Sequence, residues 1–187
     1  PTVKSPIVLF EECKLPEDAA SRPGKSTQFT IGVACYPEGH SDNPDSHDDL
    51  LRLKEKFDAG AQYAISQMFL DAQTFLEFER RARAIGIDAP LIPGIKPVTR
   101  YNELIRLAEN KRFGFTVPQD FLDRMKAHKD DNAAMHKIGI EYCVEQCRIL
   151  IDAGVAGIHF YSMNGKKNVK SVLEELTRPQ KVKLYAV

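Results

Sequence analysis

The chain has 187 residues, with 26 basic and 26 acidic side chains, so its formal net charge at pH 7 is zero. This balance argues against a nucleic-acid partner or an anionic membrane surface, since both bind proteins that carry a positively charged surface. No apolar run has the length of a membrane span or the form of a signal peptide. The four cysteines have no paired CxxC spacing, so we expect reduced thiols and a cytoplasmic location.

The first 28 residues have no clear place in the predicted pattern. "SPIVLF" has the composition of a strand, but "EECKLPEDAASRPGKS" reads as an exposed loop. We therefore treat residues 1–28 as an N-terminal extension and residues 29–187 as the folded domain. The domain begins with "FTIGVACYP", an apolar run that predicts a strand.

Three later segments repeat one plan: an amphipathic helix, a glycine and an apolar run. The expected helices span residues 49–59, 75–85 and 142–153, and the glycines that follow are Gly60, Gly86 and Gly154. Glycine just past a helix is the usual left-handed cap. The apolar runs are "YAISQMFLD", "PLIPGIKPV" and "AGIHFYSMN". They do not alternate with polar residues, which is typical of parallel strands covered on both faces.

The remaining segments predict further helices. One spans residues 102–110, a second lies in "VPQDFLDRMKAH" with Pro118 in its first turn, and a last one spans residues 169–176. "KDDNAAMHKIG" leads into the long helix that ends at Ala153. Cys143 and Cys147 lie one turn apart in that helix, where two buried small hydrophobic side chains are the expected role.

Alternating strands and helices predict an α/β fold, either an open doubly wound sheet or a (β/α)8 barrel. No GxGxxG follows a strand. Polar residues instead follow each apolar run, where barrel enzymes build their sites: Tyr36, Glu38, His40, Gln67, Asp71, Lys96, Tyr161 and Asn164. A barrel needs eight strands, and four are evident here. We expect a TIM-barrel type fold of which this chain holds about half.

Four motifs carry a family resemblance: "GVACYPEGH", "LKEKFDAGAQYAISQMFLD", "LIPGIKPV" and "GIHFYSMN". In this order they resemble the second half of the catalytic barrel of methylenetetrahydrofolate reductase, from about Phe29 to Leu176. The resemblance implies FAD at the top of a (β/α)8 barrel. It also implies hydride transfer from NADH or NADPH to 5,10-methylenetetrahydrofolate, giving 5-methyltetrahydrofolate for one-carbon metabolism and methionine biosynthesis.

The resemblance implies a set of flavin contacts. Tyr36 and His40 match the YPxxH segment, and a tyrosine ring offers a flat amphipathic face. Asp49, Lys56 and Ile65 match positions that line the FAD site. The alternatives are that His40 only organises its loop and that Asp49 and Lys56 form a solvated helix face.

Two residues match positions that face the substrate. Gln67 matches a strand-end glutamine between flavin and folate, which we expect to act in catalysis and substrate binding, because a primary amide both donates and accepts. The alternative role for Gln67 is to form hydrogen bonds with backbone groups at the top of the barrel. Tyr161 matches a site-facing aromatic, with core packing as the alternative. We expect Glu38 to organise its loop.

The "HSDNPDSHDD" segment has a second interpretation, because histidine and aspartate are metal ligands. Its spacing matches no standard metal motif, so we expect no metal site. Loop acids before a helix also serve as N-caps. Asp45 or Ser46 in that role explains the segment better.

The sequence also departs from the family pattern. The first four strands and their general-acid glutamate are missing, and neither Glu11 nor Glu12 is assigned that role. Gly165 follows Asn164 where the family has an arginine that meets folate, and Glu103 replaces a polar position near folate.

Half a barrel leaves open edges and an uncovered inner face, so we expect self-association or a partner that supplies the missing half. The alternatives to the reductase are a non-catalytic half-barrel, serving as a degenerate flavin-binding or assembly module, and a different barrel enzyme.

Overall fold

The computed structural model describes residues 30–40, 46–109, 116–162 and 166–178. Its strands are β1 (Gly32–Cys35), β2 (Tyr63–Phe69), β3 (Leu91–Ile95) and β4 (His159–Phe160). Its helices are α2 (Ser46–Asp58), α3 (Ala72–Ala84), α4 (Tyr101–Glu109), α5 (Gln119–Ala127), α6 (Asn132–Asp152) and α7 (Lys166–Thr177). None of these helices is long and apolar enough to cross a membrane.

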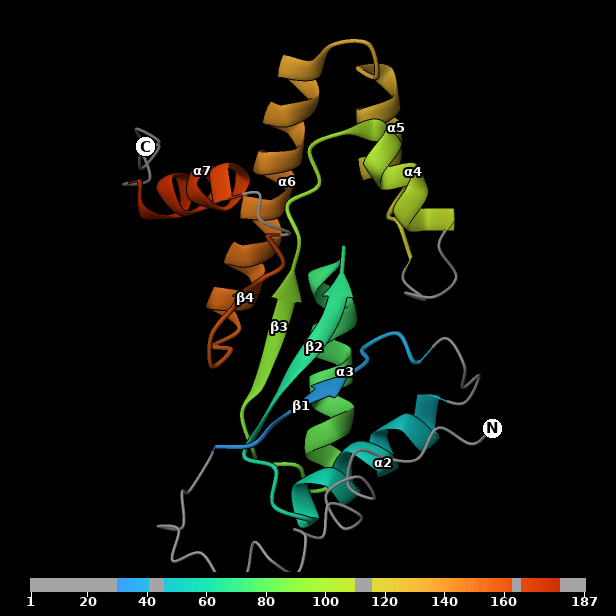
Figure 1. Cartoon of the computed structure of the whole chain (residues 1–187), viewed down its shortest axis with the longest axis vertical. Helices are drawn as coiled ribbons and strands as arrows, with labels where there is room; N and C mark the ends of the chain where they lie inside the picture. The colour runs from blue at the N-terminus through green and yellow to red at the C-terminus, as the bar shows by residue number, and fades with distance from the viewer. Residues whose placement is uncertain (1–29, 41–45, 110–115, 163–165, 179–187) are drawn as a thin grey trace, which may run out of the picture.

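The four strands form one sheet in the order β1-β2-β3-β4, and every neighbouring pair is parallel. This confirms the predicted α/β fold with four strand–helix units. All strands therefore end at the same edge of the sheet, where the polar residues of the sequence were expected to gather. Figure 1 shows α4, α5 and the N-terminal part of α6 beyond that edge.

The helix boundaries follow from local capping. Asp71 accepts the Gln73 N–H at the start of α3, and Asp131 accepts the Ala133 and Ala134 N–H groups at the start of α6. The glycines after α2, α3 and α6 have φ angles of 109°, 79° and 80°, so the predicted left-handed caps are confirmed. Such values favour glycine because it has no Cβ.

Several helix boundaries differ from the prediction, and α2 and α3 each start three residues before the predicted position. Helix α6 starts ten residues before 142, at Asn132, because Asp131 caps it there. Helix α7 starts at Lys166, ahead of the predicted residue 169. Pro118 is the N-cap of α5 and precedes its first turn. The "SPIVLF" segment lies outside the described residues.

One face of the sheet is covered by helices. The core there joins β2, β3, α2, α3 and α6, with Phe69, Phe75, Leu91 and Leu150 fully buried. Figure 1 shows α3 behind the sheet and α2 beside it. Cys143 and Cys147 are buried in this core as free thiols, as expected of small hydrophobic residues. A second cluster joins α4, α5 and α6, where the Phe121 and Tyr142 rings stack with centroids 4.0 Å apart.

The opposite face of the sheet is open within the described part of the chain. Ala34, Ile65 and Ile92 form one row across β1, β2 and β3. Ala34 is exposed, and Ile65 and Ile92 are only half-buried. Figure 1 presents this face to the viewer with no described helix across it. In a closed barrel this row would line the packed interior.

Candidate functional site

The "CYPEGH" segment forms a tight turn after β1. The Gly39 N–H donates to the Tyr36 carbonyl at 3.1 Å, and Gly39 has a φ of 90°. The turn brings the Tyr36 and His40 rings edge to face, with centroids 4.7 Å apart. The His40 backbone N–H donates to Asp49 Oδ2 at 2.6 Å, which ties the turn to α2. Tyr36, His40 and Asp49 therefore belong to one cluster.

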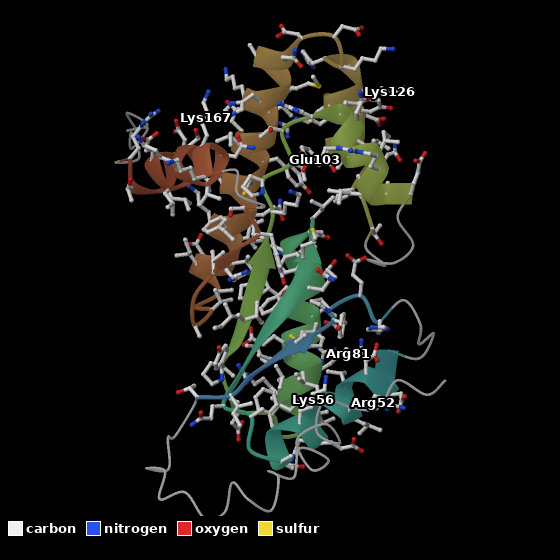
Figure 2. The ribbon with its side chains drawn as sticks, viewed as in Figure 1. Arg52, Lys56, Arg81, Glu103, Lys126 and Lys167 are labelled. Carbon is white, nitrogen blue, oxygen red and sulfur yellow. The ribbon has the colours of Figure 1, made fainter. Side chains whose placement is uncertain are left out.

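Lys56 joins this cluster from two turns further along α2. It is half-buried, and burial lowers the pKa of its ammonium group while the nearby Cys35 and Asp49 oppose that shift. Cys35 ends β1 and is 2% exposed, and burial raises the pKa of its thiol to about 12. In Figure 2, Lys56 lies toward β1, whereas Arg52 points away and pairs with the exposed Asp48. Lys56 thus places a partly desolvated cation beside the end of β1.

Gln67 lies near the end of β2, two residues beyond Ile65. Its Oε1 accepts the Met68 N–H at 2.9 Å. The side-chain NH2 group is therefore the part of the amide left to donate to a ligand. Gln67 is half-buried, so the described residues do not enclose it completely.

Tyr161 reaches across the sheet from the end of β4. Its hydroxyl donates to the Ser66 carbonyl on β2 at 2.9 Å. Its ring lies over Gly94 on β3, where a Cβ would come within 2.6 Å of the ring. Burial raises the pKa of Tyr161, and the Cys35 and Tyr36 side chains are close enough to add to the shift. The ends of all four strands therefore meet around Tyr161.

Glu38 connects the turn after β1 to the chain before α5. Its Oε2 accepts the Thr116 N–H at 2.7 Å, so its predicted role in organising the loop is confirmed. Burial raises the pKa of this carboxyl, although the Thr116 hydrogen bond opposes the shift.

Lys96 and Glu103 form an ion pair at the end of β3. The Lys96 Nζ lies 2.9 Å from a Glu103 carboxylate oxygen, and the two side chains are only 11% and 24% exposed. Figure 2 shows Glu103 on α4 near the chain that leaves β3. Glu103, which the resemblance places near folate, is thus already paired with a lysine of the same chain.

The metal interpretation concerns residues 40–49. Residues 41–45 lie outside the described part, as does the proposed cap Asp45. Among the residues that the structure does describe, no group of three histidine, cysteine or acidic side chains is placed to hold a metal ion. His40 and Asp49 are joined by the hydrogen bond given above.

The predicted site residues fall into two neighbouring groups. Tyr36, His40, Asp49 and Lys56 surround the end of β1, and Gln67 and Tyr161 meet through Ser66. Sequence reasoning missed Ser66 and His159, whose ring contacts Tyr161 edge to face at 4.8 Å. The two-residue spacing of His159 and Tyr161 places both side chains on one face of a strand, a signal that the sequence did contain.

A parallel sheet with polar groups converging at the carboxyl ends of its strands is the architecture of β/α-barrel enzymes. This chain contributes four such strands. The methylenetetrahydrofolate reductase family model matches residues 22–177, so the chain belongs to that family.

Curated relatives carry the same name. The chain is 42% identical over 149 residues to methylenetetrahydrofolate reductase 1 of Schizosaccharomyces pombe, covering 80% of this chain and 24% of the relative. It is 43% identical over 149 residues to a probable methylenetetrahydrofolate reductase (NADPH) of Caenorhabditis elegans, covering 79% and 22%. An NADH form from Arabidopsis thaliana is 34% identical over 160 residues, covering 79% and 26%. The chain thus spans about a quarter of the length of these relatives.

A solved structure shares the fold. A Clostridium thermocellum protein described as binding two copies of 5-methyl-5,6,7,8-tetrahydrofolic acid superposes with a TM-score of 0.50 and 16% sequence identity. The match covers 79% of this chain and 53% of that protein. At this identity the likeness supports the fold.

Proposed function

We propose that this chain forms the second half of the FAD and folate site of a methylenetetrahydrofolate reductase. The enzyme would reduce 5,10-methylenetetrahydrofolate to 5-methyltetrahydrofolate with NADH or NADPH. The observation that carries this proposal is the convergence of Tyr36, Lys56, Gln67 and Tyr161 at one edge of a parallel sheet, in a chain of this family.

The residues around β1 fit FAD. The half-buried Tyr36 offers a ring face, which suits a flat aromatic ligand. Lys56 is a cation disfavoured by partial burial, and a bound diphosphate would offset that penalty. His40 and Asp49 hold the turn that carries Tyr36, and Ile65 would provide an apolar contact from the open face. When bound, FAD would carry the hydride between nicotinamide and folate.

Gln67 and Tyr161 would bind and orient the substrate. Because the Gln67 Oε1 is taken by the Met68 N–H, its NH2 group would donate to an acceptor on the folate ring system. Tyr161 would provide an aromatic wall, since its hydroxyl is already used on Ser66. The folate ligand of the Clostridium thermocellum neighbour is consistent with this substrate class.

The working site needs more strands than the described sheet contains. We propose that residues 29–187 are one half of a barrel, with residues 1–28 as an extension of separate role. Four further strands, from a second copy or from a partner carrying the first half, would cover the open face. A partner carrying the first half would also supply the proton donor. We also propose a cytoplasmic location, which the free thiols of Cys35, Cys143 and Cys147 support.

An FAD titration of the full chain, followed by visible absorption and flavin fluorescence, tests the first part. We expect quenched fluorescence and a shifted flavin band. Lys56→Met should weaken binding by about tenfold, the scale of one charge-assisted hydrogen bond. Lys129→Met, at an exposed turn after α5, is the matched control and should change nothing. Unchanged flavin spectra at saturating FAD would remove the proposed cofactor site.

The non-catalytic alternative has one observation in its favour. The Glu103 carboxylate is committed to Lys96 at a position that the resemblance places near folate. Anaerobic addition of 5-methyltetrahydrofolate to the FAD complex separates the two functions. Bleaching of the flavin band shows electron transfer from the folate and supports the reductase. Flavin that binds and stays oxidised would favour a flavin-binding or assembly module.

A further inference from the structure

The pairing of β2 with β3 contains one extra residue on β2. Ile65 pairs with Ile92, but the next pair is Met68 with Gly94, so three steps along β2 match two along β3. Ser66 and Gln67 occupy this β-bulge. Bulges next to binding sites re-aim the side chains that follow them.

The bulge changes which face of the sheet the later β2 side chains occupy. Ala64 and Phe69 both lie in the helix-covered core, although they are an odd number of residues apart. Strict alternation would place them on opposite faces of the sheet. The extra residue lets Phe69 return to the core.

Ser66 supplies the polar contacts at the bulge. Its side chain is fully buried, and its hydroxyl donates to the Gln67 carbonyl at 2.9 Å and accepts the Gly94 N–H at 2.8 Å. The Tyr161 hydroxyl donates to the Ser66 carbonyl at 2.9 Å. A Cβ at Gly94 would lie 2.4 Å from that carbonyl oxygen, so only glycine allows this approach.

We propose that Ser66 is a positioning residue for Gln67. Its hydroxyl fixes the backbone of the bulge. The Tyr161 hydroxyl binds the Ser66 carbonyl from the end of β4, and Gly94 on β3 packs closely against the same carbonyl. The Gln67 amide, whose Oε1 accepts the Met68 N–H, is thereby held so that its NH2 group is left to donate to a ligand. This inference rests on the proposed role of Gln67 in binding a ligand with an acceptor edge, such as the ring system of a reduced folate.

NMR of the 15N-labelled full chain tests the positioning directly. The Gln67 side-chain amide pair is assigned by its loss in Gln67→Glu. In Ser66→Ala we expect this pair to move toward the shifts of a free glutamine and to exchange faster with water. Ser66→Thr, which keeps the hydroxyl, should preserve it. Tyr161→Phe should move it the same way by a smaller amount.

Thr99→Val is the matched control, because Thr99 is another buried hydroxyl whose oxygen accepts from Asn168, away from the bulge. It should leave the Gln67 pair in place. An unmoved pair in a folded Ser66→Ala chain overturns the proposal. If Ser66→Ala does not fold, Tyr161→Phe provides the test, because the Tyr161 side chain is half exposed and its substitution should be tolerated. An unmoved Gln67 amide pair in Tyr161→Phe would then overturn the proposal.

Binding measurements keep this inference separate from the proposed function. In Ser66→Ala we expect about tenfold weaker affinity for 5-methyltetrahydrofolate, the loss of one well-placed hydrogen bond, with FAD affinity unchanged. Weakened FAD and folate binding together would overturn a role specific to Gln67. A wild-type chain that binds neither ligand refutes the proposed function, whereas the NMR shifts still decide the positioning.

Discussion

The two faces of the sheet differ in how completely they are packed. On the covered face, Phe69 and Leu91 of the sheet are buried almost entirely against α2, α3 and α6, and so is Phe75 of α3. The open face leaves Ala34 exposed and Ile65 only half-buried. Most proposed site residues follow the strands at their carboxyl ends, and Asp49 and Lys56 reach that edge from α2. The residues that would bind ligands are therefore largely distinct from those that form the core.

This difference follows from the chain's connections. The connections between the four parallel strands carry α2, α3 and α6, which pack on one side of the sheet. The other side is left for further strands. Substitutions on the two faces should therefore have unequal effects on stability.

Phe75→Ala should have the largest effect. Phe75 is 0% exposed and packs against Phe69 and Phe78, so its removal leaves a cavity worth about 3–5 kcal/mol of unfolding free energy. Ile65→Ala, on the open face, should cost less than about 1 kcal/mol. Urea denaturation of both variants measures the comparison. Equal losses would show that the open face is packed as tightly as the covered one.

Gly139→Ala should cost about 1–3 kcal/mol, although alanine is the better helix former. A Cβ at Gly139 would lie 2.1 Å from the Val98 carbonyl oxygen, so α6 would have to move away from the chain after β3. Gly157→Ala is the control, since a Cβ there meets nothing within 4 Å. Thermal denaturation of the pair compares them, and a Gly139→Ala chain as stable as wild type would contradict this close contact.

Tyr142→Phe should cost about 1 kcal/mol. The Tyr142 hydroxyl donates to the Leu70 carbonyl at 2.9 Å, and its loss leaves that carbonyl without its donor while the stacked ring remains. Gln146 on the same helix accepts the Ala72 N–H, so hydrogen exchange at the start of α3 should accelerate only modestly. Stability equal to wild type would mean that water replaces the hydroxyl at no cost.

Glu38→Gln should give the smallest effect, seen as a change in pH dependence. Burial raises the folded-state pKa of Glu38, so the folded chain holds this proton more tightly than the unfolded chain. Stability should fall as pH rises from the ordinary glutamate pKa through the raised one. Glu38→Gln should lose that slope, and Glu141→Gln, on the exposed side of α6, should keep it. Identical pH profiles for the three chains would contradict the burial of Glu38.

The sequence predicted the covered face better than the site. Helix periodicity and terminal glycines located α2, α3 and the end of α6, because these signals are local. The bulge at Ser66 and the reach of Tyr161 to β2 depend on register and on Gly94, which are set between segments far apart in the chain. The sequence did identify Gln67 as a polar residue in an apolar strand, but not the contacts that hold it.

Hydrogen–deuterium exchange of the full chain with and without FAD tests the central claim most directly. FAD should slow exchange in residues 32–40 and 63–69, at the ends of β1 and β2, and leave residues 72–84 of α3 unchanged. Protection confined to α3 and the covered face, or no protection at saturating FAD, would contradict a flavin site at the strand ends of the open face.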